Sequence, residues 1–120
     1  MKFELSQRFF FEAAHTLERV HETDSSRRIH GHTYHACVTV SGPQDPSTGM
    51  IVDLAVLRGT IAEVRERLDH RFLDEVPELG RPTLENLCVY IAQALASKQW
   101  FVARIEVERP ASGDSCRLIP

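Results

Sequence analysis

His30 and His32, two histidines separated by one glycine, are the residues of this chain whose type and spacing most plainly suit chemistry. Alternate side chains of a β-strand point to the same face, so both imidazoles would point the same way. His15, at the end of an upstream β-type run, would arrive from a neighbouring strand. Three imidazole nitrogens with one open position suit a catalytic Zn²⁺, although histidines also occur on strands for other reasons. We predict a zinc site at these three residues.

The same alternation decides which neighbouring histidine belongs to the site. His35 falls on the opposite face of the strand from His30 and His32. We therefore expect it to be a packed or interface histidine and leave it out of the metal site.

The elements that must position these histidines follow from periodicity and turn residues. Polar residues dominate 16–28, which predicts a loop, and a helix runs from Leu54 to Leu68 behind Asp53 as its N-cap. Thr83 is the expected N-cap of a second helix that ends near Ser97 and Lys98. The expected strands cover Phe3 to Ala14, about His30 to Ser41, Trp100 to Glu108, and Ser115 to Ile119, with Val102, Arg104, Glu106 and Glu108 on one face of the third.

The resulting order, β-β-α-α-β-β, predicts an α+β fold: a four-stranded antiparallel sheet with both helices on one face. No helix or strand is assigned to residues 69–82. At 120 residues the chain is long enough for one domain, 1–120. The apolar and edge surface of so small a sheet favours a homo-oligomer.

Charge and composition limit the possible partners. A formal net charge of −3 gives no basic surface for nucleic acid or an anionic membrane, so neither is expected as a partner. No apolar run approaches the length of a membrane span, and the first residues lack the apolar core of a signal peptide. The expected location is therefore cytoplasmic.

Several short motifs, taken in order along the chain, resemble the 6-pyruvoyl-tetrahydropterin synthase and 6-carboxy-tetrahydropterin synthase family. They are Phe11–His15, His30–His32, Asp45–Asp53, Leu68–His70, Pro82–Asn86 and Val107–Glu108. The resemblance implies the tunnelling fold (T-fold), in which sheets join into trimeric barrels and two trimers stack into a hexamer. It also implies active sites at subunit interfaces.

The resemblance further implies roles for single residues. It implies that His15, His30 and His32 are zinc ligands. It implies that Asp69 and His70 are a catalytic pair, in which the carboxylate orients the imidazole. It also implies that Glu108 anchors the pterin's guanidinium-like edge, and that Thr83 and Glu85 lie near the pterin. From the residues alone, Asp69 and His70 could instead end a helix, Glu108 could be an exposed strand acid, and Thr83 could be only an N-cap.

One position departs from the family pattern. Enzymes of this family usually carry a catalytic cysteine four residues before the first histidine of the His-Gly-His motif, where this chain has Ser26. A known variant carries a glutamate three residues before it, where this chain has Arg27. A serine hydroxyl needs a partner base to act. Glu22, Asp24 or His21, in the same loop, could supply one, and Glu22 is our candidate.

The implied substrate is the small molecule 7,8-dihydroneopterin triphosphate. The leading interpretation is a zinc-dependent 6-carboxy-5,6,7,8-tetrahydropterin synthase-like lyase on the route to queuosine. A paralogue that binds zinc and a pterin but catalyses a different side-chain reaction is the first alternative. The second is a non-catalytic module that binds a pterin or purine.

Overall fold

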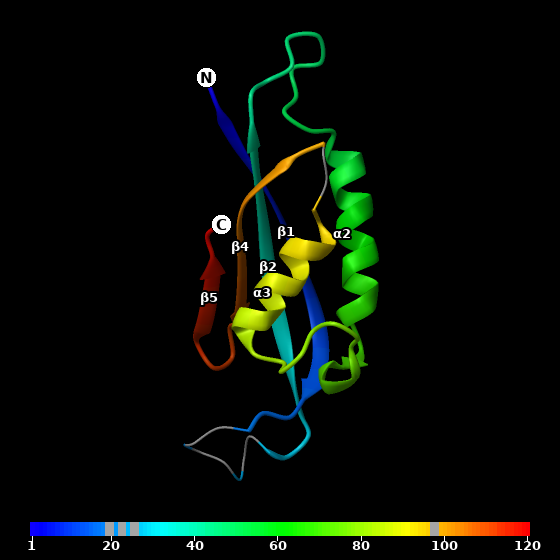
Figure 1. Ribbon diagram of the computed structural model, residues 1–120, viewed down its shortest axis with the longest axis vertical. Helices are drawn as coiled ribbons and strands as arrows, with labels where there is room; N and C mark the ends of the chain where they lie inside the picture. The colour runs from blue at the N-terminus through cyan, green and yellow to red at the C-terminus, as the bar shows by residue number, and fades with distance from the viewer. Residues whose placement is uncertain (19–20, 22–23, 25–26, 97–98) are drawn as a thin grey trace.

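A five-stranded sheet in the order β3-β1-β2-β4-β5 forms one layer of the computed structural model, which describes residues 1–18, 21, 24, 27–96 and 99–120 (Figure 1). The fold is elongated, with principal extents of 56 × 23 × 23 Å, because its two longest strands run most of its length. The strands are β1 (Phe3–His15), β2 (His30–Gly42), β3 (Arg71–Phe72), β4 (Phe101–Arg109) and β5 (Asp114–Leu118).

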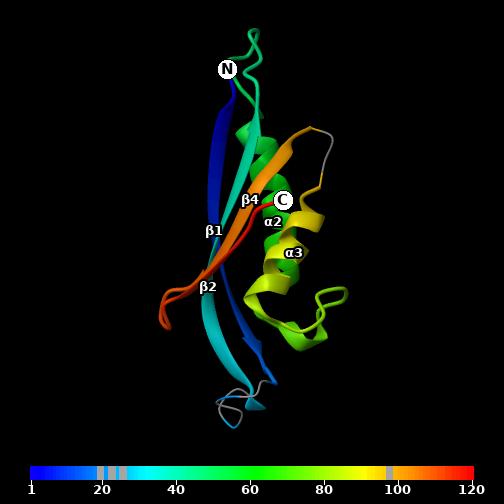
Figure 2. The same ribbon diagram turned by 60° about the vertical axis from the view of Figure 1, so that its left-hand side comes forward.

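Two helices, α2 (Leu54–Leu68) and α3 (Leu84–Ala94), cover one face of this sheet, as Figure 2 shows. Each begins where an N-cap was predicted: the Asp53 carboxylate accepts from Ala55 N at 2.8 Å, and the Thr83 hydroxyl from Asn86 N at 3.1 Å. The second helix ends earlier than predicted, and Ser97 and Lys98 lie outside the described residues. No helix in the described ranges is long and apolar enough to cross a membrane.

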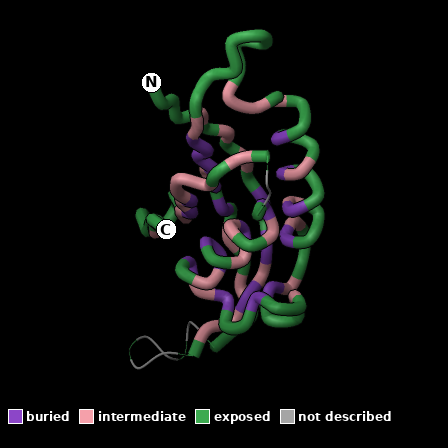
Figure 3. The backbone as a smooth tube through the Cα atoms, turned by 45° about the horizontal axis from the view of Figure 1, so that its top comes forward, coloured by how far each residue is buried: buried purple, intermediate pink, exposed green. Residues whose placement is uncertain are grey.

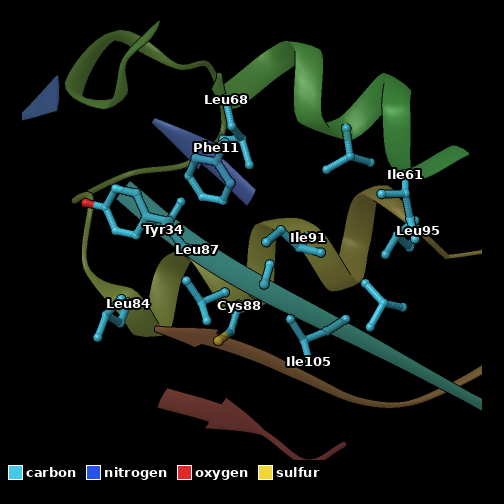
Figure 4. Close-up of a cluster of buried hydrophobic side chains, with 14 of the residues drawn as sticks. Phe11, Tyr34, Ile61, Leu68, Leu84, Leu87, Cys88, Ile91, Leu95 and Ile105 are labelled. Carbon is cyan, nitrogen blue, oxygen red and sulfur yellow. The ribbon is translucent and has the colours of Figure 1, made fainter. Parts of the chain in front are cut away.

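Pairing between β1 and β2 is antiparallel and continuous over 13 residues, from Phe3 opposite Gly42 to His15 opposite His30. Alternate residues of both strands therefore face the helices and form the core. Figure 3 marks the buried residues of the strands and helices in purple. The Phe11 and Tyr34 rings stack with centroids 4.9 Å apart, and Leu87 and Ile91 of α3 complete this packing (Figure 4).

The prediction of a four-stranded antiparallel sheet was wrong in one strand. Arg71 and Phe72 form β3, which pairs in parallel with Ala13 and Ala14 of β1, so the sheet has five strands and is mixed. A short 3-10 helix, η1 (Leu73–Glu75), follows at once. Two residues are too few to show a period-2 pattern, and this stretch therefore looked like a loop.

A second correction concerns β4. Thr39 lies opposite Arg104 but Val40 lies opposite Val102, so β4 has one extra residue at this point, a β-bulge. The bulge turns Val102 toward the core, whereas Arg104, Glu106 and Glu108 keep the opposite face. Strict alternation, which placed all four on one face, does not hold across a bulge.

Truncation of the buried face of α3 should destabilise the fold. Leu87 is fully buried, so Leu87→Ala should lower the free energy of unfolding by about 2–5 kcal/mol, measured by urea denaturation. Val89→Ala is the matched control, because Val89 lies on the same helix but is 39% exposed, and it should cost less than about 1 kcal/mol. Equal losses in the two variants would contradict this description of the core.

Candidate metal centre

The β1–β2 register brings the three predicted histidines together at one end of the sheet. His15 lies directly opposite His30, and His32 follows two residues later on the same face. His15 Nε2 lies 3.0 Å from His30 Nε2 and 3.1 Å from His32 Nε2. Nitrogens bound tetrahedrally to zinc at about 2.0–2.1 Å lie roughly 3.3 Å apart. Two of the separations are therefore close to those of a zinc ligand set, and all three nitrogens lie within 4.8 Å of one another, so this group could hold a metal ion.

Backbone carbonyls hold two of the three rings in the orientation a metal needs. His15 Nδ1 lies 3.0 Å from Pro82 O, and His30 Nδ1 lies 2.7 Å from Arg28 O. A ring nitrogen that donates to a carbonyl carries the proton, which leaves Nε2 with a free lone pair for a metal. Pro82 immediately precedes the N-cap Thr83, so the start of α3 positions His15.

Burial keeps the His15 and His32 rings neutral. It lowers the pKa of His15, and it lowers that of His32 to about 4, with further contributions from neighbouring His15 and Arg109. Metal binding requires neutral imidazole, so both rings are ready to ligate at neutral pH without first losing a proton. The chemistry and geometry of this donor set fit Zn²⁺.

Asp69 and His70 form a second polar group at the same end of the molecule. Asp69 Oδ2 lies 2.9 Å from His70 Nδ1, and Asp69 Oδ1 accepts from the Glu12 backbone N–H at 2.9 Å. That N–H lowers the pKa of Asp69, with the His70 hydrogen bond and the Arg65 charge acting in the same direction. An ionised carboxylate that accepts from Nδ1–H would leave His70 Nε2 to exchange a proton.

His70 and His32 line the same open concavity, of about 560 Å³, together with residues of β1, β2 and β3. The His70 backbone has φ 57°, and its N–H donates to Glu12 O at 2.6 Å. This left-handed turn carries the chain from the end of α2 into β3. The ring remains exposed, with 76% of its side chain accessible.

The other predicted site residues are distributed differently. Glu108 lies opposite His35 on the face turned away from the three histidines, and His35 points there as predicted. Thr83 caps α3 one residue after Pro82, and Glu85 is exposed in the first turn of that helix. Ser26 and Glu22 lie outside the described residues.

Sequence reasoning missed three contributors to this end of the molecule. Two are the backbone carbonyls of Arg28 and Pro82, which carry no side-chain signal. The third is Arg109, whose charge lowers the pKa of His15 and of His32. Its position one residue after Glu108, and therefore on the opposite face of β4, was the only sequence signal.

Comparison with known proteins assigns the chain to a family. A family model described as 6-pyruvoyl tetrahydropterin synthase matches residues 4–117. The chain belongs to the 6-pyruvoyl tetrahydropterin synthase family. It is 37% identical over 102 residues to the 6-pyruvoyl tetrahydrobiopterin synthase of Pongo abelii, a match covering 73% of this chain and 70% of that protein. The resemblance seen in the sequence motifs is thus confirmed.

Relatives named as 6-carboxy-tetrahydropterin synthases match this chain at similar sequence identity. The 6-carboxy-5,6,7,8-tetrahydropterin synthase of Synechocystis is 35% identical over 88 residues, covering 69% of this chain and 67% of that protein. The solved 6-pyruvoyl tetrahydropterin synthase of Caenorhabditis elegans superposes with a TM-score of 0.84 at 25% identity, covering all of this chain and 96% of that one. The T-fold is confirmed, whereas the two named activities are both represented among relatives of similar identity.

The lowered histidine pKa values predict how the metal-free protein responds to acid. A group with a depressed pKa in the fold binds its proton more readily when unfolded, so its contribution to stability is present above about pH 6.5 and is lost as pH falls toward about 4. Thermal melts of chelator-treated protein should show a melting temperature that decreases over this window. His32→Gln should flatten the decrease, whereas His35→Gln, on the other face, should not. An unchanged slope in His32→Gln would disprove this explanation.

Proposed function

We propose that this chain is a zinc-dependent lyase of the 6-carboxy-5,6,7,8-tetrahydropterin synthase type, acting on 7,8-dihydroneopterin triphosphate in a queuosine-type pathway. The observation that carries the proposal is the convergence of three histidine Nε2 atoms, two of whose rings are held by backbone carbonyls, in a chain of this family. The open concavity that His32 shares with His70 leaves room for a small molecule beside the ligand set.

Zinc held by His15, His30 and His32 would polarise oxygens of the substrate side chain and make adjacent C–H and O–H groups more acidic. The protons released there need an acceptor near neutral pH. His70 is our candidate, with Asp69 Oδ2 2.9 Å from its Nδ1, which leaves Nε2 free to accept a proton. The Glu12 N–H and Arg65 keep that carboxylate ionised.

Glu108 is our candidate for the group that recognises the pterin ring. A carboxylate accepts two hydrogen bonds from an N–H/NH₂ edge, much as it does from arginine. Thr83 and Glu85, at the start of α3, are proposed to lie near the pterin, although the Thr83 hydroxyl also serves as the N-cap.

The placement of these groups supports assembly of the site from more than one subunit. Glu108 faces away from the histidines of its own chain, and β1 from Phe3 to Glu12 has β2 as its one strand neighbour among the described residues. An open strand edge pairs readily with another chain. We propose a homohexamer, a dimer of trimers, in which Glu108 of one subunit meets the histidines of another.

Ser26 keeps an alternative activity open. Without a cysteine at this position the chain could be a paralogue that binds zinc and a pterin but catalyses a different side-chain reaction. A non-catalytic pterin- or purine-binding module is the second alternative. In the enzymatic case Ser26 would act with a neighbouring base, for which Glu22 is our candidate.

Metal analysis tests the zinc site directly. Protein purified without chelator should contain about one zinc per chain. His30→Ala or His32→Ala should weaken zinc affinity by at least about 100-fold, since even loss of an outer hydrogen-bond partner costs roughly 10–100-fold. His35→Ala, on the same strand but the opposite face, should retain zinc. Metal binding that survives in His30→Ala and His32→Ala would refute the proposed site.

Turnover distinguishes the three functions. Zinc-loaded protein incubated with 7,8-dihydroneopterin triphosphate should release triphosphate and acetaldehyde, detected by anion exchange and by an aldehyde assay. His70→Ala should retain zinc but lose about 10²–10⁴-fold in kcat, because the positioned proton acceptor is removed. Tight pterin binding without either product would favour the non-catalytic module, and other products would favour the paralogue.

The same turnover assay tests whether residues of the 16–28 loop take part in catalysis. A gain of activity in Ser26→Cys would indicate that the missing thiol limits the native chain. If alanine variants of Glu22, Asp24 and His21 all retain full turnover, none of them is the required base.

A further inference from the structure

Arg109 is a partly buried cation beside the three histidines. It ends β4, one residue beyond Glu108, which lies opposite His35; alternation therefore puts Arg109 on the same face as Tyr34 and the histidines. Its side chain is only 16% exposed. Tyr34, on that same face, has its ring centroid 5.6 Å from that of His32. The Arg109 charge acts on both His15 and His32.

Two buried polar atoms at this position have no hydrogen-bond partner within the described part of the chain: the Tyr34 hydroxyl and Arg109 Nε. Tyr34 is fully buried, and Figure 4 shows its hydroxyl pointing away from the labelled apolar side chains. Burial raises the pKa of Tyr34 to about 12, so the hydroxyl keeps its proton, and the Arg109 charge opposes that rise from nearby. The hydroxyl oxygen can accept from the Arg109 guanidinium, and this contact also opposes the rise in the Tyr34 pKa. The hydroxyl hydrogen and Arg109 Nε–H still lack an acceptor within the described part of the chain.

The ion pair between Arg109 and Asp114 does not satisfy Arg109 Nε. Arg109 bonds Asp114 across the β4–β5 hairpin, with the two atoms 3.1 Å apart, but that contact uses a terminal guanidinium nitrogen and leaves Nε unpaired. Buried donors of this kind normally have an acceptor.

The charges around the site favour an anion as that acceptor. Neutral imidazoles add no charge to a bound Zn²⁺, and Arg109 adds one positive charge. The carboxylates that act electrostatically on these histidines are Asp74, which accepts two hydrogen bonds from Thr16, and Asp114. A bound Zn²⁺ and Arg109 would together carry three positive charges, and these two carboxylates carry two negative charges. The remaining positive charge would be balanced by an oxyanion of the ligand.

We propose that Arg109 and Tyr34 form an oxyanion-binding site beside the metal centre, which selects a ligand whose side chain carries a carboxylate or a phosphate. This inference rests on the proposed metal site and adds to it the chemical class of the group held next to the metal. Arginine binds both oxyanions through paired N–H groups, and the tyrosine O–H adds a third donor.

Cobalt-loaded protein tests the inference without any turnover. The visible absorption of Co²⁺ reports ligands that enter its coordination sphere or change its surroundings. Titration with acetate and, separately, with inorganic phosphate should perturb the wild-type spectrum, and the tighter of the two identifies the preferred oxyanion. Arg109→Gln should weaken that binding by about 10–100-fold, and Tyr34→Phe by less, while Co²⁺ affinity stays within about threefold.

Arg117→Gln is the matched control. Arg117 belongs to the same hairpin and bonds Glu106 at 3.0 Å, but it is exposed and lies on the other face, so anion affinity should not change. Anion binding that is absent from the wild type, or equal in wild type and Arg109→Gln, overturns the inference while Co²⁺ binding leaves the proposed metal site intact. Failure of the wild type to bind Co²⁺ overturns both. Tyr34→Phe, which removes one oxygen, provides the same test if Arg109→Gln does not fold.

Discussion

The register of the β1–β2 pair is the constraint on which the candidate site depends. Thirteen continuous residue pairs fix which side chains face the helices, and the last pair places His15 opposite His30. A shift of one residue would turn every side chain of one strand to the other face. The Phe11–Tyr34 stack and the other buried side chains oppose such a shift, because it would expose the core. The same apolar packing that stabilises the fold therefore also aligns the three histidines.

The segments that flank this strand pair orient the side chains of the candidate site. Backbone carbonyls from Arg28 and Pro82 orient two histidine rings, and Pro82 is held by the start of α3, whose N-cap follows it. On the other edge of β1, Asp69 bonds the Glu12 N–H and His70 at once. Both helices therefore contribute a terminus to the same end of the sheet, where the concavity opens.

The two faces of the sheet carry different chemistry. The helix-covered face holds the candidate metal centre with Tyr34 and Arg109, and the uncovered face holds Glu108 and His35. Family membership is shown by the match over residues 4–117, and relatives of similar identity carry both synthase names. The reaction therefore has to be argued from the side chains of the candidate site. Two groups bear on that choice: Ser26, at a position where the family pattern has a cysteine, and Arg109, beside the candidate metal centre.

Local patterns in the sequence were enough to determine the helices, the four longer strands, both N-caps and the three histidines, because each depends on a period or on a cap within a few residues. Tertiary structure alone decided the rest. β3 is two residues long and exists because β1 offers it an edge, and the bulge at Val102 reflects pairing with β2. Arg109 became part of the candidate site through contacts with residues 75 or more positions away in the chain. Contacts of that kind are set by how the strands and helices pack, and no local periodicity records them.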